Sequence, residues 1–306
     1  MSLFADFNRD FFNIYDEATK GNISPILGGL DFQTAYLQWL VSRSGRCCPE
    51  FVIDDKACIY GLRIYRELLL DDLETDKFVG FVPSGNQKYM NMFRRHGIKT
   101  VCLEREMGCK EFGFYEWLEA HYGVDLIATV PADQINGGSP ASTASGPSRQ
   151  MGLTDVMMQF ANSGKRFLDI GCGKGGAMVI ANQFNVGAVD GLEISPNLCD
   201  IACRNLDFLG LPGRIINQSA SEFDGYGNYD ILYMYDPFRG ELFGKVMSRI
   251  EECIGDKPVI LIYANPYHHK DVIRSGKFSL VDTVDTDFFH RDVKIYSANG
   301  TVKSHE

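Results

Sequence analysis

The stretch "RFLDIGCGKGGAMVIANQF" (166–184) decides the fold, because it combines three signals in one place. A short apolar run is followed by a loop that contains Gly171, Gly173 and Gly175, and then by an apolar run long enough for a helix. A strand, a glycine loop and a helix in this order bring a ligand against the helix N-terminus. The stretch therefore predicts a ligand-binding unit of an α/β fold.

Two acids around this loop define the kind of ligand. Asp169 stands directly before the glycines, where a carboxylate repels a pyrophosphate and suits a cationic group such as an amino acid's ammonium. The next apolar run, "VGAVDGLEIS" (186–195), carries Glu193, which lies 22 residues after Gly171. An acid at about this spacing accepts hydrogen bonds from ribose hydroxyls. A ribose together with a cationic group fits S-adenosylmethionine better than NAD.

Five segments in order extend this pattern over about residues 150–298, and with them the chain resembles the class I S-adenosylmethionine-dependent methyltransferases. The segments are "LDIGCGKGG" (168–176), "GLEISPNLCDIACRNLDFLGL" (191–211), "RIINQSASEFD" (214–224), "YDILYMYDPF" (229–238) and "PVILIYANP" (258–266). The resemblance implies a Rossmann-like, seven-stranded domain. It also implies S-adenosylmethionine as the cofactor and S-adenosylhomocysteine as the product.

The resemblance assigns the cofactor site residue by residue. In the third segment the family often has an acid or an amide near the adenine, whereas this chain has Ser219 and Ala220 there, which we expect to contact it. The full set of expected cofactor contacts is Asp169, Gly171, Cys172, Gly173, Gly175, Glu193, Ile194, Ser219, Ala220 and Asp236.

The stretch "YMYDPFRG" (233–240) ends the fourth predicted strand and supplies the first candidates for catalysis, Asp236, Pro237 and Phe238. Methyl transfer depends mainly on holding the acceptor in line, and a base is needed only for an acceptor that arrives protonated. Asp236 is the first candidate base, because strand ends at this edge of an open sheet face the ligand crevice. His268 and His269 are second candidates. The structural alternatives are a loop-capping Asp236, a core Phe238 and solvated histidines.

The same stretch also indicates a different kind of methyl acceptor. "DPF" is similar to the [D/N]-P-P-[Y/F] signature of amino-group methyltransferases, with one proline where that signature has two. In that group, the resemblance implies, the acid and a backbone carbonyl grip the amino group while the ring stacks on it. The alternative function is thus an N-methyltransferase of a protein or nucleic-acid amino group. A non-catalytic nucleotide-binding protein is a second alternative.

The part of the chain before residue 131 predicts a second, smaller α/β domain. Strand-like and helix-like runs alternate over 22–105, which indicates a parallel sheet covered by helices. "ILGGLDF" (26–32) resembles a degenerate half of a nucleotide-binding fold, similar to small N-terminal domains of some sugar-modifying enzymes. Gly28 and Gly29 are present, but Gln33 stands near the place of the third glycine. A docking or oligomerisation domain without a ligand is the alternative.

Two further acids of this first domain, Asp54 and Asp55, end a predicted strand, where they either meet a ribose or form a turn. The segment "PADQINGGSPASTASGPSRQ" (131–150) has the composition of a linker or a lid, and a lid is favoured because it directly precedes the glycine-rich site. The expected division is therefore an N-terminal helix and small Rossmann-like domain (1–130), a linker or lid (131–150) and a cofactor-binding domain (151–306).

Composition and charge limit the remaining function classes. The 306 residues are 45% hydrophobic and carry 30 basic and 40 acidic side chains, a net charge of −10 that disfavours nucleic acid and favours a small-molecule or glycan-type acceptor. The nine cysteines include no C-x-x-C pair, which predicts a reducing compartment and no metal. No apolar run approaches the roughly 20 residues of a membrane span. The start, "MSLFADFNRDFFNIYDEATK", lacks a signal-peptide pattern, so we expect a cytoplasmic protein, with a homodimer compatible.

Overall fold

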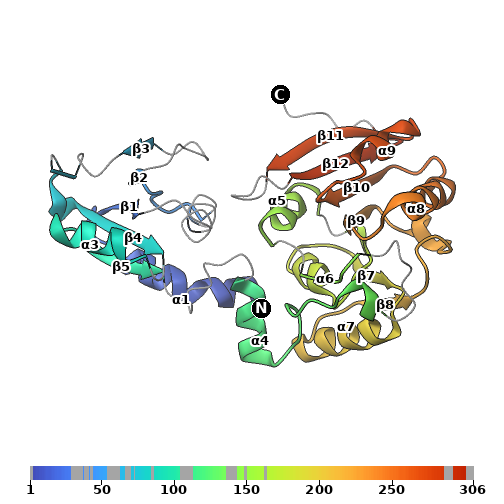
Figure 1. Ribbon diagram of the computed structural model, residues 1–306, viewed down its shortest axis with the longest axis horizontal. Helices are drawn as coiled ribbons and strands as arrows, with labels where there is room; N and C mark the ends of the chain where they lie inside the picture. Colours follow the sequence, from blue (N-terminus) through green and yellow to red (C-terminus); the bar gives the residue numbers. More distant parts are fainter. Residues whose placement is uncertain are drawn as a thin grey trace. The chain divides into compact units, whose positions relative to one another are not determined.

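The chain forms two compact units, Met1–Trp117 and Leu118–Glu306, each built around its own sheet (Figure 1). The computed structural model describes residues 3–28, 37, 41, 44–53, 63–65, 70–71, 73–83, 86–103, 113–135, 143–147, 150–161, 164–285 and 292–300. No helix among these residues is long and apolar enough to cross a membrane.

The first unit contains a five-stranded, all-parallel sheet in the order β3-β2-β1-β4-β5. This is a doubly wound strand order, and it confirms the small Rossmann-like domain expected from the alternating pattern. Its described elements are α1 (Leu3–Ala18), β1 (Ser24–Gly28), β2 (Phe51–Ile53), β3 (Arg63–Tyr65), η2 (Thr75–Lys77), β4 (Phe78–Pro83), α3 (Gln87–Arg95) and β5 (Lys99–Leu103).

Gly28, at the end of β1, has a packing role. A Cβ there would lie 2.7 Å from the ring of Phe93, and one at Gly80 on β4 would lie 2.3 Å from the same ring. The two glycines therefore let α3 press Phe93 onto the sheet. The other predicted ligand residues of this unit, Gly29, Gln33, Asp54 and Asp55, lie outside the described residues.

The second unit contains a seven-stranded sheet in the order β11-β12-β10-β9-β6-β7-β8, in which only β12 runs antiparallel to its neighbours. This arrangement confirms the Rossmann-like class I methyltransferase fold. The strands are β6 (Arg166–Ile170), β7 (Ala188–Glu193), β8 (Arg214–Asn217), β9 (Ile231–Tyr235), β10 (Val259–Ala264), β11 (Phe278–Asp285) and β12 (Asp292–Ala298).

Helices cover both faces of this sheet, with α5, α6 and α7 on one side and α8 and α9 on the other (Figure 1). Right-handed crossovers require this, because the strands from β6 to β8 and those from β9 onward progress in opposite directions. The helices of this unit are η4 (Ala132–Gln134), α5 (Gln150–Phe160), α6 (Gly176–Ala181), α7 (Pro196–Leu209), η5 (Gly225–Asn228), α8 (Gly240–Ile254) and α9 (His269–Arg274), and the division of the chain after Trp117 falls within α4 (Gly113–Tyr122).

The reversal of direction falls between the neighbouring strands β6 and β9. In an open α/β sheet, ligands bind outside the carboxyl ends of the strands at such a switch point. The residues that follow β6 and β9 are the glycine loop and the Asp236-Pro237-Phe238 turn. The topology therefore brings together the two motifs that the sequence singled out.

The central strands are held by a continuous apolar core. Four consecutive residues of β6 and all six of β10 are buried. A single cluster joins Leu168, Leu232 and Leu261 of three adjacent strands to Phe243 of α8. Burial on both faces explains why these strands read as nearly unbroken apolar runs.

Packing around β7 yields a stability prediction. A Cβ on Gly191 would lie 2.5 Å from Met178 Sδ and 2.7 Å from Cys172 Sγ, so we expect Gly191→Ala to lower the free energy of unfolding by about 1–3 kcal/mol. The matched change Gly244→Ala lies on exposed α8 with nothing within 4 Å, and it should leave stability unchanged or raise it by up to about 1 kcal/mol. Urea unfolding of both variants measures this. Equal stability of the two variants would contradict the packing described.

Candidate functional site

The glycine loop between β6 and α6 is wound into a left-handed turn. Gly171, Gly173 and Gly175 have φ angles of +76°, +53° and +85°, which side chains other than glycine rarely adopt. The N–H groups of Gly171 and Cys172 both donate to Leu192 O on β7, at 2.8 and 3.1 Å. The loop is thereby pinned over the end of β7.

Asp169 is the second-last residue of β6, just before this loop, and is only 3% exposed. Burial, and secondly the charge of Glu193, raise the pKa of its carboxyl group to about 8. Within the described part of the chain, no hydrogen bond reaches this carboxylate. A buried acid of this kind is a site where a cationic ligand group replaces the missing solvation.

Glu193 ends β7 beside it and is 6% exposed. Its Oε2 accepts the N–H of Gly173 and its Oε1 accepts the N–H of Ser195, each at 2.9 Å. Burial raises the pKa of Glu193, and the backbone N–H donors offset part of this rise. An ionised carboxylate has about four acceptor positions, more than the backbone N–H groups of this site fill, so acceptor capacity remains for a hydroxyl donor.

The other expected cofactor contacts differ in what they offer. Cys172 has its side chain against Gly191, and its N–H and C=O are bonded to Leu192 and Gly175, so it has no polar group to spare for a ligand. The side chain of Ala220 lies in the core and its C=O accepts the Tyr226 hydroxyl at 2.7 Å.

Ile194 and Ser219 lie closer to the rim of the site. Both are partly buried just beyond the ends of β7 and β8, where Glu193 pairs with Asn217. The Ser219 hydroxyl is 3.0 Å from that of Ser221. Of the two residues expected at the adenine, Ser219 is thus the one with a hydroxyl at the edge of the site.

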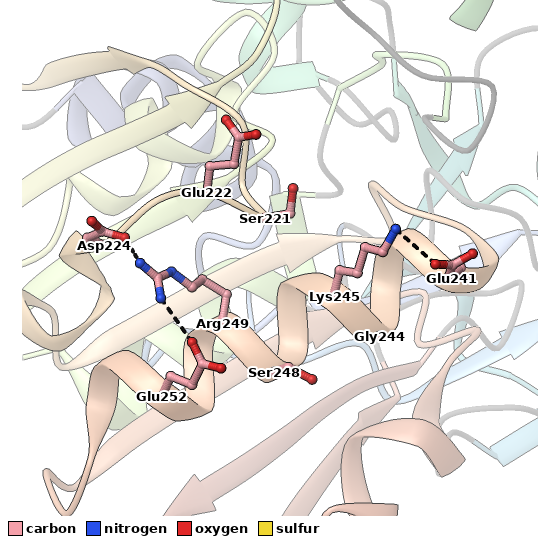
Figure 2. A pocket seen from close by; sticks show the side chains of 9 residues that line it. All are labelled: Ser221, Glu222, Asp224, Glu241, Gly244, Lys245, Ser248, Arg249 and Glu252. Carbon is pink, nitrogen blue, oxygen red and sulfur yellow. Dashed lines mark hydrogen bonds and ion pairs between the residues drawn. The ribbon is translucent and has the colours of Figure 1, made fainter.

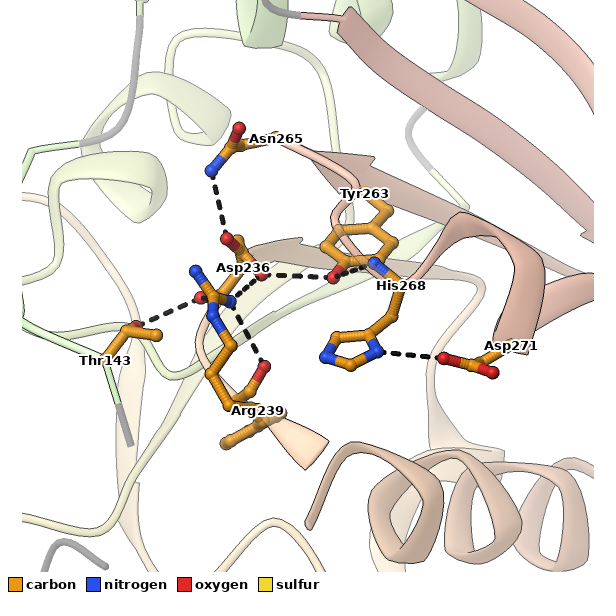
Figure 3. Close-up of polar contacts among 8 residues, drawn as sticks. Thr143, Asp236, Arg239, Tyr263, Asn265, His268 and Asp271 are labelled. Atoms are coloured by element: carbon orange, nitrogen blue, oxygen red, sulfur yellow. Dashed lines mark hydrogen bonds and ion pairs between the residues drawn. The ribbon is translucent and has the colours of Figure 1, made fainter. Parts of the chain in front are cut away.

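Asp236 begins the turn after β9 and is held from three directions (Figure 3). Its Oδ1 forms an ion pair with Arg239 and accepts the Tyr263 hydroxyl at 3.2 Å, and its Oδ2 accepts the Asn265 amide at 3.0 Å. The residue is 3% exposed, with a left-handed φ of +44°. A carboxylate that is ion-paired and hydrogen-bonded in this way is suited to organise the turn.

Pro237 and Phe238 complete the turn, and each contacts a different part of the unit. A Cβ on Gly171 would lie 2.8 Å from Pro237 Cβ, which shows that this proline touches the glycine loop across the switch point. Phe238 is partly buried and packs against the core cluster.

His268 and His269, after β10, are placed differently from each other. His268 Nδ1 lies 2.9 Å from Asp271 Oδ2, its ring stacks on Phe243 at 4.4 Å, and its Nε2 is buried without a hydrogen-bond partner (Figure 3). His269 Nδ1 contacts the Tyr296 hydroxyl at 2.8 Å, and burial together with Lys294 and Lys270 lowers its pKa. Only His268 therefore combines an orienting carboxylate with an unused ring nitrogen.

The described part of the predicted lid lies over both motifs. The Thr143 hydroxyl and N–H donate to the carbonyls of Asp236 and Pro237 at 3.0 and 3.2 Å, and Ser145 forms a β-bridge with Val130. A Cβ on Gly173 would lie 2.5 Å from Ser145 Oγ. Residues 143–145 thus connect the glycine loop to the turn after β9.

A polar cluster with two buried members, Lys174 and Asn205, lies near the start of this segment, and the sequence interpretation missed it. Lys174 of the glycine loop, 7% exposed, pairs with Asp125 at 2.5 Å. Asn205 of α7 donates to the carbonyls of both residues, at 2.9 and 2.7 Å, and accepts the Asp125 N–H at 2.9 Å. The only sign of this cluster in the sequence was the position of Lys174 inside the glycine loop.

An open surface groove of about 930 Å³ lies elsewhere, between α8 and the loop after β8 (Figure 2). Arg249 forms ion pairs there with Asp224 and Glu252, and Lys245 pairs with Glu241. None of the sequence-predicted site residues lines this groove. Among the described residues, no group of three or more His, Cys, Asp or Glu side chains is arranged to hold a metal ion.

Comparison with known proteins gives structural likeness only. No family model matches the chain, and no curated protein matches it in sequence. Similar solved structures include MtNAS in complex with MTA and tNA (13% identity, TM-score 0.40, 48% of this chain and 58% of that one). Others are a ribosomal protein L11 methylase from Lactobacillus delbrueckii subsp. bulgaricus (13%, 0.41, 48% and 77%) and the PH0226 protein from Pyrococcus horikoshii OT3 (12%, 0.41, 48% and 88%).

The matched region thus spans 58% of the MtNAS chain. Likeness at this level of identity and TM-score carries no argument about function. The assignment of the fold rests on the strand order, and the chemistry rests on the residues of the site itself.

The raised pKa of Asp169 predicts a pH-dependent stability. The folded protein holds this proton up to about pH 8, whereas an ordinary aspartate releases it near 3.8, so the contribution of Asp169 is fully favourable below about 3.8 and is lost as the pH rises to about 8. We expect Asp169→Asn to gain stability relative to the parent across this window. Denaturant unfolding at several pH values measures the difference, with the exposed Asp207→Asn as the control. A difference that does not change with pH would contradict the burial of an unpartnered acid.

Proposed function

We propose that residues 118–306 form an S-adenosylmethionine-dependent methyltransferase that acts on an oxygen or nitrogen of a small molecule, such as a sugar or nucleotide-linked metabolite. One observation carries the proposal. The buried carboxylate of Asp169, without a hydrogen bond from the described residues, lies at the end of β6, next to the switch point and to Glu193.

The residues at the ends of β6, β7 and β8 fit this cofactor. Asp169 would hold the ammonium of the amino-acid part, because a cation restores the solvation that burial has removed. Glu193 would accept the ribose hydroxyls with the acceptor capacity that its backbone donors leave. Ser219 would reach the adenine at the rim. Gly171, Gly173 and Gly175 let a ligand approach the backbone of this turn closely, since these three positions carry no side chain.

The chemistry divides between the cofactor and the chain. When bound, the cofactor supplies a methyl group already activated on a sulfonium. The chain has to exclude water, hold the acceptor in line and remove a proton where the acceptor carries one. We assign the positioning to the Asp236 turn, which Arg239, Tyr263 and Asn265 hold rigid.

We assign the proton to His268 in preference to Asp236. Asp271 accepts from Nδ1 in the tautomer that leaves a lone pair on Nε2, and that nitrogen has no other partner. The Asp236 carboxylate, by contrast, already forms an ion pair with Arg239 and accepts hydrogen bonds from Tyr263 and Asn265. The two groups thus take different roles.

Methylation of a protein or nucleic-acid amino group is the weaker alternative. That function needs a ring free to stack on the target, and Phe238 packs against the core. The net charge of −10 also disfavours a polyanion. A non-catalytic nucleotide-binding protein is the second alternative. Because it would use the same Asp169 and Glu193, transfer of a methyl group, and not cofactor binding, distinguishes it from an enzyme.

The setting that we propose for this activity is the cytoplasm, because the nine cysteines of the sequence include no C-x-x-C pair and follow no disulfide framework. We propose that the first unit serves docking, oligomerisation into a homodimer, or binding of a glycan-type acceptor. We also propose that the segment 131–150 acts as a lid, because Thr143 and Ser145 already lie against both motifs.

Titration calorimetry with S-adenosylhomocysteine tests the cofactor assignment. We expect binding at micromolar concentrations, accompanied at pH 7 by proton release, because Asp169 loses the proton that its pKa of about 8 retains in the free protein. The release is measured by repeating the titration in buffers of different ionisation enthalpy. Glu193→Ala should weaken binding at least tenfold, whereas Glu222→Ala, an exposed acid nearby, should not. No binding by the parent at high micromolar ligand would remove the proposal.

The assignment of the base is tested with two neighbouring histidines. With an acceptor found by transfer of a radiolabelled methyl group into a metabolite extract, His268→Gln should lower kcat by about 10²- to 10⁴-fold. His269→Gln, whose ring faces Tyr296, should keep kcat within a few-fold of the parent. Equal kcat values for the two variants would assign the proton to another group.

A further inference from the structure

The turn after β9 has a counterpart in the next strand. β9 is followed by Asp236-Pro237-Phe238, and β10 is followed by Asn265-Pro266-Tyr267. A pattern of an acid or amide, then proline, then an aromatic residue therefore occurs twice. The two strands are parallel neighbours in which Tyr235 pairs with Ala264, so both turns begin at the same level of the sheet. Asp236 and Asn265 both have left-handed φ angles, +44° and +51°.

The two turns are joined, yet they face different surroundings. The Asn265 amide donates to Asp236 Oδ2 at 3.0 Å. Asp236 is 3% exposed and Phe238 packs against the core, whereas Asn265 is exposed and Tyr267 is 73% exposed. The first turn therefore serves the interior, and the second presents the same chemistry to solvent.

The ring of Tyr267 is held in place although it is exposed. The Arg239 guanidinium carbon lies 4.8 Å from the ring centroid, and the His268 ring meets it edge-on at 5.1 Å. Arg239 is itself fixed by its ion pair with Asp236. An aromatic ring that is oriented by a cation and a second ring, with most of its surface in water, is a prepared stacking surface.

The amide of Asn265 supplies a polar group beside this ring. Its nitrogen is committed to Asp236, and its oxygen points away from Asp236 (Figure 3). Among the described residues, no donor reaches that oxygen. A carbonyl oxygen in this position accepts a hydrogen bond from an N–H or O–H group of a ligand.

We propose that Asn265-Pro266-Tyr267 is the turn that binds the methyl acceptor, and that the acceptor is a flat aromatic or heteroaromatic ring carrying a hydroxyl or an amine. Tyr267 stacks on the ring and Asn265 Oδ1 accepts the hydrogen of the group beside it. This rests on the proposed methyltransferase function, and it narrows the acceptor from small molecules in general to planar ones. His268 follows Tyr267 directly in the chain, and its ring lies 5.1 Å from that of Tyr267.

A pair of probes separates a flat ring from a saturated one. Resorcinol and cis-cyclohexane-1,3-diol carry the same two hydroxyls, and only the first can stack face to face. Binding of each to the full chain, loaded with S-adenosylhomocysteine, is measured by saturation-transfer NMR titration. We expect resorcinol to bind at least five times more tightly than the saturated diol. Equal binding of the two, or no binding of resorcinol, would overturn the planar class.

Variants locate the surface. Stacking on an aromatic side chain accounts for about a tenfold or larger change in affinity, so Tyr267→Ala should weaken resorcinol binding by about that factor, and Tyr267→Phe should retain it. Phe208→Ala removes a ring on α7 that is 61% exposed and should have no effect. Unchanged resorcinol binding in Tyr267→Ala would overturn the proposal.

Calorimetry with S-adenosylhomocysteine on the same variants keeps the two proposals apart. We expect the affinity of Tyr267→Ala for it to equal that of the parent. If the parent fails to bind S-adenosylhomocysteine, the methyltransferase function falls, and the acceptor turn falls with it. If every variant binds S-adenosylhomocysteine as the parent does, and Tyr267→Ala binds resorcinol as tightly as the parent, only the proposal of the acceptor turn is wrong.

Discussion

The site depends on the burial of two carboxylates, Asp169 and Glu193, under one glycine loop. Each lies at the end of a central strand, and together with burial the charge of Glu193 raises the pKa of Asp169 to about 8. Glu193 is stabilised by the N–H groups of Gly173 and Ser195, whereas no described residue bonds to the carboxylate of Asp169. This asymmetry gives the loop its shape and leaves one acid for a cationic ligand.

The strand order then divides the carboxyl edge into two halves. β6, β7 and β8 present the acids and the glycine loop, while β9 and β10 present two proline turns. Pro237 against Gly171, and Thr143 on the carbonyls of Asp236 and Pro237, connect the halves. A cofactor on one half and an acceptor on the other would meet at the switch point between β6 and β9, which is where in-line transfer requires them.

Local patterns predicted much of this, and long-range contacts account for the rest. The run around Gly171, Gly173 and Gly175 predicted a strand, a loop and a helix because each signal lies within a few residues of the next. Asp125 and Asn205 are 80 residues apart, and no local pattern predicts that they meet over Lys174. The Asn265-Pro266-Tyr267 turn was visible as a repeat of Asp236-Pro237-Phe238, but its significance required knowing that β9 and β10 are neighbours.

The sequence by itself determined the fold class, the two-sheet organisation and the identity of the acids beside the glycine loop, because periodicity and glycine placement act over short distances. The tertiary structure alone decided which groups are available for chemistry. Only the folded chain shows that the Asp236 carboxylate is bonded by Arg239, Tyr263 and Asn265. Likewise, the sequence does not distinguish Phe238 from Tyr267, whereas in the structure Phe238 is partly buried against the core and Tyr267 is exposed. Burial and hydrogen bonding depend on residues far apart in the chain, and they set both pKa and accessibility.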